Sequence, residues 1–164
     1  YFEYENKKTN IKLNQIRDYK NDNYIVYIPK EKTKKFCKAD DVMIGRYGPP
    51  IFQILRGLEG AYNVALMKAI PQKEIINEYL YWFLNNRKIQ DYVIKKSIRA
   101  AGQSGVNKKA LEPYKIHLPS ISEQNKIVKK IKEIQVQSKL LSTLYSSKLF
   151  YLQYQLSHFF AIIF

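Results

Sequence analysis

The sequence predicts an α+β fold, in which a loop-rich domain is followed by one long α-helix with the spacing of a coiled coil. The 164 residues are 46% hydrophobic and 26% charged, a composition typical of a globular protein. Short β-rich segments and turns fill residues 1–70, whereas no Gly or Pro occurs between Pro119 and about Gln155. We therefore predict a domain over residues 1–119 and a helix with an apolar tail over residues 120–164.

Three segments of the first 70 residues have the composition of β-strands. They are Ile25–Ile28, Asp41–Ile44 and Ala61–Ile70, and each is followed directly by Gly or Pro. Gly45–Pro50 contains two glycines and two prolines, so it is predicted to form a loop. Asn63 could contact a base or form a turn, and we favour the turn.

Helical spacing replaces the strand pattern over residues 72–98. Asn85-Asn86 is expected to divide this stretch into two helices. A flexible loop over residues 100–105 follows, and then a short helix over Lys108–Glu112 that Pro113 ends. Tyr114–Leu118 alternates apolar and polar residues, which predicts one more strand.

The residues after Pro119 predict the long helix. Ser120-Ile-Ser-Glu123 matches a capping box. The apolar residues that follow recur mainly at spacings of four and three, which predicts roughly 35 helical residues, about 52 Å in length. The apolar side chains form a stripe along the helix, here called the seam, which must pair with another helix. We expect the apolar tail Phe159–Phe164 to be buried in a partner or to result from truncation. The seam residues are Ile127, Ile131, Ile134, Leu141, Leu144, Tyr145 and Leu152.

The charge of the chain favours a polyanionic partner. Lys and Arg outnumber Asp and Glu by 28 to 14, which gives a net charge of +14. Between Arg87 and Lys115, eight residues are basic and two are acidic. Such a cluster binds nucleic-acid phosphates because it releases condensed counterions. The alternative is a solvated helix face without a ligand.

Two loops carry side chains that suit the reading of DNA. Arg46 can bind guanine, and Tyr47 can contact a base or a sugar. The glycine-containing loop over residues 100–105 and its flanks add polar groups for base edges and lysines for phosphates. The predicted base contacts are Arg46, Tyr47, Arg99, Gln103, Ser104 and Asn107, and the predicted phosphate contacts are Lys95, Lys96, Lys108 and Lys109.

The sequence contains no recognisable catalytic or metal-binding motif. The single cysteine, Cys37, excludes a disulfide framework and a cysteine-based zinc site, and it fits a reducing compartment. There is no P-loop and no nucleophile elbow. No secretory signal is visible, and no apolar run approaches the ~20 residues that span a bilayer. We therefore expect a cytoplasmic protein that is not an enzyme and does not bind a membrane.

Six strings, taken in order, resemble the specificity (S) subunit of type I DNA restriction–modification systems. The strings are QIRDY from Gln15, DDVMIGRYG from Asp40, GAYNVAL from Gly60, YLYWFL from Tyr79, AGQSGVNK from Ala101 and LPSISEQ from Leu118. The resemblance extends from about Tyr4 to Leu144. It corresponds to one target recognition domain followed by its spacer helix.

The resemblance implies a non-catalytic subunit that recognises one half of a bipartite site in double-stranded DNA. Its implied partners are modification (methyltransferase) subunits, a restriction subunit, and a second recognition domain or another copy paired through the helix. S-adenosylmethionine, Mg²⁺ and ATP are expected only in the partner subunits, and no cofactor is expected in this chain. Recognition domains of the family usually begin with some tens of residues more, so we expect residues 1–119 to be a partial domain.

Two other functions remain open from the sequence. The chain could be the recognition part of a fused type II methyltransferase–nuclease, in which a methyltransferase core would precede it. Alternatively, it could be a coiled-coil protein-interaction module, which would bind helical partners and would lack steeply salt-dependent DNA binding.

Overall fold

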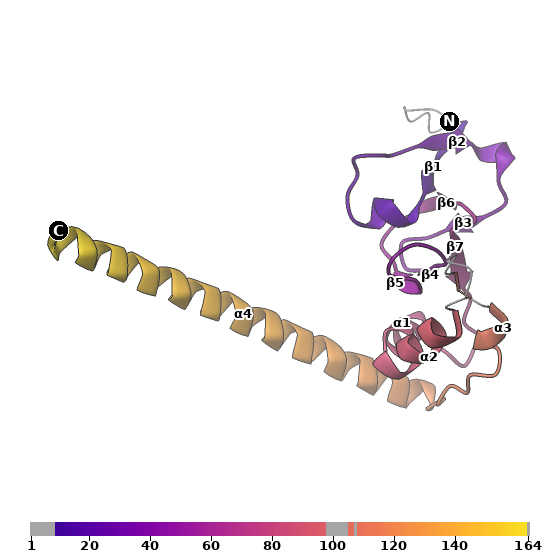
Figure 1. The fold of residues 1–164 in the computed structure, drawn as a ribbon. Coiled ribbons are helices and arrows are strands. Elements are labelled where there is room, and N and C mark those ends of the chain that lie inside the picture. The colour runs from indigo at the N-terminus through magenta and orange to yellow at the C-terminus, as the bar shows by residue number, and fades with distance from the viewer. Residues whose placement is uncertain (1–8, 98–104, 107, 164) are drawn as a thin grey trace. The chain divides into compact units, whose positions relative to one another are not determined.

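The computed structural model describes residues 9–97, 105–106 and 108–163, with side chains up to Tyr151 except Ala110 and Phe150 (Figure 1). The chain divides into two compact units, residues 1–121 and residues 122–164. The first unit combines two β-sheets with short helices, and the second is a single long helix. The predicted α+β class is confirmed.

The strands of the first unit form a four-stranded and a three-stranded sheet. The first has the order β2-β1-β6-β3, in which β1 and β6 are parallel and the other pairs are antiparallel. The second has the order β5-β4-β7 and is antiparallel. The strands are β1 (Asn10–Asn14), β2 (Tyr27–Pro29), β3 (Phe36–Cys37), β4 (Val42–Gly45), β5 (Gln53–Leu55), β6 (Gly60–Tyr62) and β7 (Leu66–Ala69).

The parallel pairing of β1 with β6 depends on a glycine. Gly60 has a φ of 142°, and a Cβ atom at this position would lie 2.5 Å from the carbonyl oxygen of Lys12. Any larger residue would therefore push the two backbones apart. Two 3-10 helices, η1 (Ile16–Tyr19) and η2 (Lys30–Lys32), complete this part of the unit.

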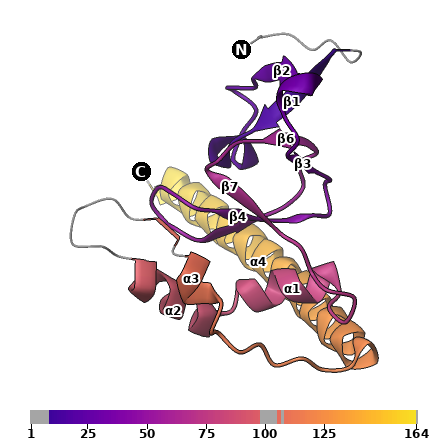
Figure 2. The same cartoon turned by 90° about the vertical axis from the view of Figure 1, so that its right-hand side faces the viewer.

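Three α-helices cover the three-stranded sheet. They are α1 (Asn77–Leu84), α2 (Arg87–Ser97) and α3 (Lys108–Leu111). The predicted break at Asn85-Asn86 is confirmed, and the side-chain oxygen of Asn86 accepts a hydrogen bond of 2.9 Å from the backbone N–H of Lys88. Figures 1 and 2 show the three-stranded sheet between the four-stranded sheet and these helices.

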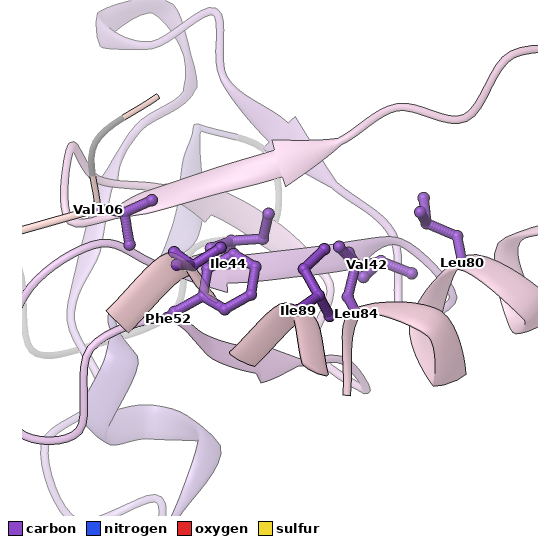
Figure 3. Close-up of a cluster of buried hydrophobic side chains, with 8 residues drawn as sticks. Val42, Ile44, Phe52, Leu80, Leu84, Ile89 and Val106 are labelled. Atoms are coloured by element: carbon purple, nitrogen blue, oxygen red, sulfur yellow. The ribbon is translucent and has the colours of Figure 1, made fainter. Parts of the chain in front are cut away.

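The main hydrophobic core lies between β4 and the helices. Figure 3 shows its side chains converging from β4, the β4–β5 loop, α1, α2 and the segment before α3. Each large side chain buried in this way contributes roughly 1.5–3 kcal/mol, so the core fixes the position of the loops that leave it. The core residues are Val42, Ile44, Phe52, Leu80, Leu84, Ile89, Val93 and Val106.

The structure corrects two predicted strands. Ala61–Ile70 is not one strand, because a turn at Asn63 sends β6 and β7 into different sheets. The side-chain oxygen of Asn63 accepts a hydrogen bond of 3.0 Å from the backbone N–H of Ala65, which agrees with the predicted turn role. Tyr114–Leu118 is not a strand, since no neighbouring strand pairs with it within the described residues. Instead, Tyr79 Oη donates a hydrogen bond of 2.9 Å to the carbonyl oxygen of His117.

The second unit is the helix α4 (Ile121–Ile163). Its 43 residues span about 64 Å at 1.5 Å per residue. The helix begins directly after Ser120, as predicted, but it continues about eight residues beyond Gln155 and includes most of the apolar tail. Among the described residues, no helix is both long enough and apolar enough to cross a membrane.

Most of the predicted seam of α4 is exposed to solvent. Ile134, Leu141, Leu144 and Tyr145 are each more than half exposed. Ile127 is exposed and Ile131 is half-buried, whereas the side chain of Leu152 lies outside the described part of the chain.

Candidate nucleic-acid interface

Two loops that are distant in the sequence meet in the first unit. Tyr47, in the β4–β5 loop, forms an antiparallel β-bridge with Gly105. The neighbouring Val106 donates its backbone N–H to the carbonyl oxygen of Arg46 at 2.9 Å. The structure therefore joins the loop predicted at Gly45–Pro50 to the end of the glycine-containing loop over residues 100–105.

Buried residues hold the junction of the β4–β5 loop with Gly105 in place. Val106 is 6% exposed and Phe52 is completely buried, and both belong to the core shown in Figure 3. The backbone N–H of Phe52 also donates to the carbonyl oxygen of Gly45 at 3.0 Å, which closes the β4–β5 loop. The side chain of Tyr47 is 45% exposed. The loop therefore has a fixed base and a side chain that can reach a ligand.

A third turn reaches the same place. Arg46 donates its backbone N–H to the carbonyl oxygen of Ala65 at 2.8 Å. Its guanidinium Nη1 donates to the carbonyl oxygen of Val64 at 3.2 Å and lies beside the Tyr47 ring, with 5.1 Å between Arg46 Cζ and the ring centroid. Sequence reasoning did not single out Val64. The signal available was an apolar residue inside a turn, where polar residues are usual.

Gly105→Ala tests whether the junction positions Tyr47. An alanine Cβ would lie 2.8 Å from Cε1 and 3.0 Å from Cδ1 of Tyr47, so the ring must move. Because the ring is partly exposed, we expect the free energy of unfolding to change by less than about 1 kcal/mol. We expect DNA binding to weaken about fivefold, the equivalent of one lost contact of about 1 kcal/mol. Urea unfolding monitored by Trp82 fluorescence measures the change in stability, and a DNA titration measures the change in binding.

Tyr47→Ala supplies the control for this variant. In the Tyr47→Ala background, Gly105→Ala is expected to have no further effect on DNA binding, because the displaced ring is absent. Equal losses in both backgrounds would show that Gly105 acts on binding independently of Tyr47.

The predicted phosphate-binding lysines flank this junction in the sequence. Lys95 and Lys96 are exposed in the last turn of α2, and Lys108 and Lys109 are exposed in α3. Residues 92–111 contain these four lysines and Arg99 but no Asp or Glu. The nearest acidic residues in the sequence, Asp91 and Glu112, lie just outside this stretch. Arg99, Gln103, Ser104 and Asn107, which were predicted to contact bases, lie outside the described residues.

A comparison of the sequence with models of protein families finds a match over most of the chain. The family model described as "Type I restriction modification DNA specificity domain" matches residues 2–146. The chain is a member of that family. The match covers both the first unit and more than half of α4, so the DNA specificity domain of this family includes the helix as well as the loop-bearing part.

The fold of the specificity domain is also similar to a solved structure. The matched chain belongs to a structure titled "Structural basis underlying complex assembly and conformational transition of the type I R-M system". The TM-score is 0.59 at 18% sequence identity, and the alignment covers 84% of this chain and 35% of the other. The specificity domain therefore spans about a third of the length of that chain. A comparison with curated protein sequences yields no match.

Two kinds of site were sought among the described residues, a metal site and a reactive cysteine. They contain no group of three or more His, Cys, Asp or Glu side chains arranged to hold a metal ion. Cys37 is buried, and burial raises the pKa of its thiol despite a hydrogen bond of 3.5 Å from Asn14 Nδ2. A thiol of this kind is a poor nucleophile at neutral pH. Cys37 donates to backbone carbonyl oxygens of Leu58 and Gly60, as expected of a structural residue.

Proposed function

We propose that this specificity domain recognises one half of a bipartite site in double-stranded DNA and directs adenine methylation by partner subunits. The observation that carries the proposal is the junction of Tyr47 with Gly105. It ties the β4–β5 loop to Gly105 and Val106 over one buried core. Gly105 and Val106 belong to a stretch, residues 92–111, whose only charges are basic. Membership of the type I restriction–modification specificity family indicates the reaction to which such recognition would contribute.

The chemistry of the junction suits DNA for two separate reasons. Exposed lysines bind phosphates with a free energy that depends on the salt concentration but not on the base sequence. Base discrimination requires side chains held in a defined place, and the buried Phe52 and Val106 hold the loop that carries Tyr47. We infer that Lys95, Lys96, Lys108 and Lys109 position the domain and that Tyr47 contacts a base edge. Arg46, whose guanidinium lies beside the Tyr47 ring and donates to Val64, holds this loop in place.

We further propose that α4 pairs with a helix of a second recognition domain or of another copy and contacts modification and restriction subunits. The support is the exposed apolar seam, since Leu141 and Leu144 are 56% and 57% exposed. A coiled-coil partner would cover these side chains. S-adenosylmethionine, Mg²⁺ and ATP would then act in the partner subunits.

A domain exchange tests the recognition proposal. Residues 1–119, together with any residues that the gene encodes before them, would replace one recognition domain of a specificity subunit whose bipartite target is known. Methylated adenines would then be mapped across the host genome. We expect one half-site to change and the other to persist. The matched control reinserts the host's own domain through the same junctions, which separates the effect of the graft from that of the junctions.

Two results would contradict the proposal. The first is methylation at the original site alone, which would mean that residues 1–119 do not determine the target and would favour a protein-interaction module. The second is a chimaera that co-purifies with the modification subunits but methylates no site. Co-purification therefore has to be measured with every graft, because it distinguishes a silent complex from a failed assembly.

A further inference from the structure

The turn between β6 and β7 places an exposed apolar side chain beside the predicted DNA-reading loop. Val64 is 65% exposed, although its backbone is tightly held. Its carbonyl oxygen accepts the hydrogen bond from Arg46 Nη1, and the flanking Asn63 and Ala65 close the turn through the 3.0 Å hydrogen bond. A single exposed valine is common on protein surfaces, so the argument depends on its position rather than on its exposure.

The position follows from the register of the sheet. Gly45 pairs with Leu66 in the β4–β7 ladder, so the β6–β7 turn and the start of the β4–β5 loop leave the sheet at the same end. Arg46 then bridges them, with one hydrogen bond from its backbone and another from its guanidinium. The Nε atom of Arg46 is buried without a hydrogen-bond partner among the described residues, which shows that this side chain is packed rather than extended into solvent.

A valine side chain cannot form hydrogen bonds, which limits what it can recognise on DNA. The edges of bases in the major groove present donors, acceptors and one apolar group, the C5-methyl of thymine. We propose that Val64 contacts a thymine methyl group and thereby determines one base of the target, while Arg46 is the positioning residue that holds the turn. This inference rests on the proposed DNA-reading function and adds a contact that the sequence did not indicate.

The experiment removes the methyl group from the DNA and the valine from the protein. Each thymine of the half-site found by domain exchange would be replaced singly by deoxyuridine, which lacks only the C5-methyl. Binding of the full chain to these duplexes would be measured by fluorescence anisotropy. We expect one replacement to weaken binding by the wild-type chain about fourfold, as for one buried methyl group. We expect Val64→Ala to bind that duplex and the thymine duplex equally.

Ile70→Ala is the matched control. Ile70 is another exposed apolar residue of the same unit, at 78% exposure, but it follows the far end of β7, where Ala69 pairs with Val42. This variant should retain the fourfold effect of the methyl group. Both substitutions are at exposed positions, so both variants should unfold within about 0.5 kcal/mol of the wild type.

Three outcomes overturn the inference. One is a half-site without thymine or without any position sensitive to deoxyuridine. Another is an equal response of wild type and Val64→Ala to every replacement. The third is a uniform loss in Val64→Ala on all duplexes, which would indicate an apolar wedge between base steps. If the chimaera co-purifies with the modification subunits but yields no half-site, the proposed function itself fails, so the two failures are distinguishable.

Discussion

Phe52→Ala is expected to remove about 3–5 kcal/mol from the free energy of unfolding of the first unit. The Phe52 side chain is completely buried among β4, α1 and α2, and no other residue of the β4–β5 loop belongs to that core. The total free energy of unfolding of a natural domain is about 5–15 kcal/mol, so this loss would remove a large share of the stability. Urea unfolding monitored by Trp82, the single tryptophan in α1, measures it.

Phe52→Gly separates the contribution of the ring from that of the backbone. Phe52 has a φ of 62°, a left-handed conformation that costs a non-glycine residue about 1–2 kcal/mol. Glycine adopts this conformation without that cost. We therefore expect Phe52→Gly to be about 1 kcal/mol more stable than Phe52→Ala, although it removes more atoms. A glycine variant that is clearly less stable than the alanine variant would contradict a strained backbone at this position.

Replacing the four lysines that flank the junction in the sequence with alanine is expected to weaken DNA binding on the order of a thousandfold at 0.15 M salt. The changes are Lys95→Ala, Lys96→Ala, Lys108→Ala and Lys109→Ala. Each phosphate contact contributes about 0.9 to the slope of log K against log salt, so the slope should fall by about 3 to 4. Because phosphate contacts carry no sequence information, cognate and scrambled duplexes should lose affinity alike.

A charge-matched variant controls for a general effect of net charge. Lys32, Lys34, Lys35 and Lys38 are also exposed in the first unit, and they belong to the segment around β3. Their replacement with alanine lowers the net charge equally but is expected to change the salt slope by less than about 1. Equal slopes for the two quadruple variants would mean that the chain binds DNA through diffuse charge rather than through the junction.

Local patterns predicted the elements that depend mainly on local interactions. Strand β4, the two helices divided at Asn85-Asn86 and the start of the long helix all follow from hydrophobic spacing and capping residues. Strand β1 was not predicted, because Asn10 and Asn14 are unfavourable in strands. The structure buries both asparagines, and the side chain of Asn14 finds a partner in Cys37. That compensation comes from a residue elsewhere in the chain.

The candidate site also has parts that follow from local sequence and parts that depend on the tertiary structure. The sequence by itself determined the loop that follows β4, the basic stretch and the string order that resembles the specificity subunit, since composition and motifs are properties of neighbouring residues. The tertiary structure alone decided that Tyr47 meets Gly105 and that the turn at Val64 lies beside Arg46. Those contacts depend on strand register and on the burial of Phe52 and Val106 in one core, which are long-range interactions that no local pattern encodes.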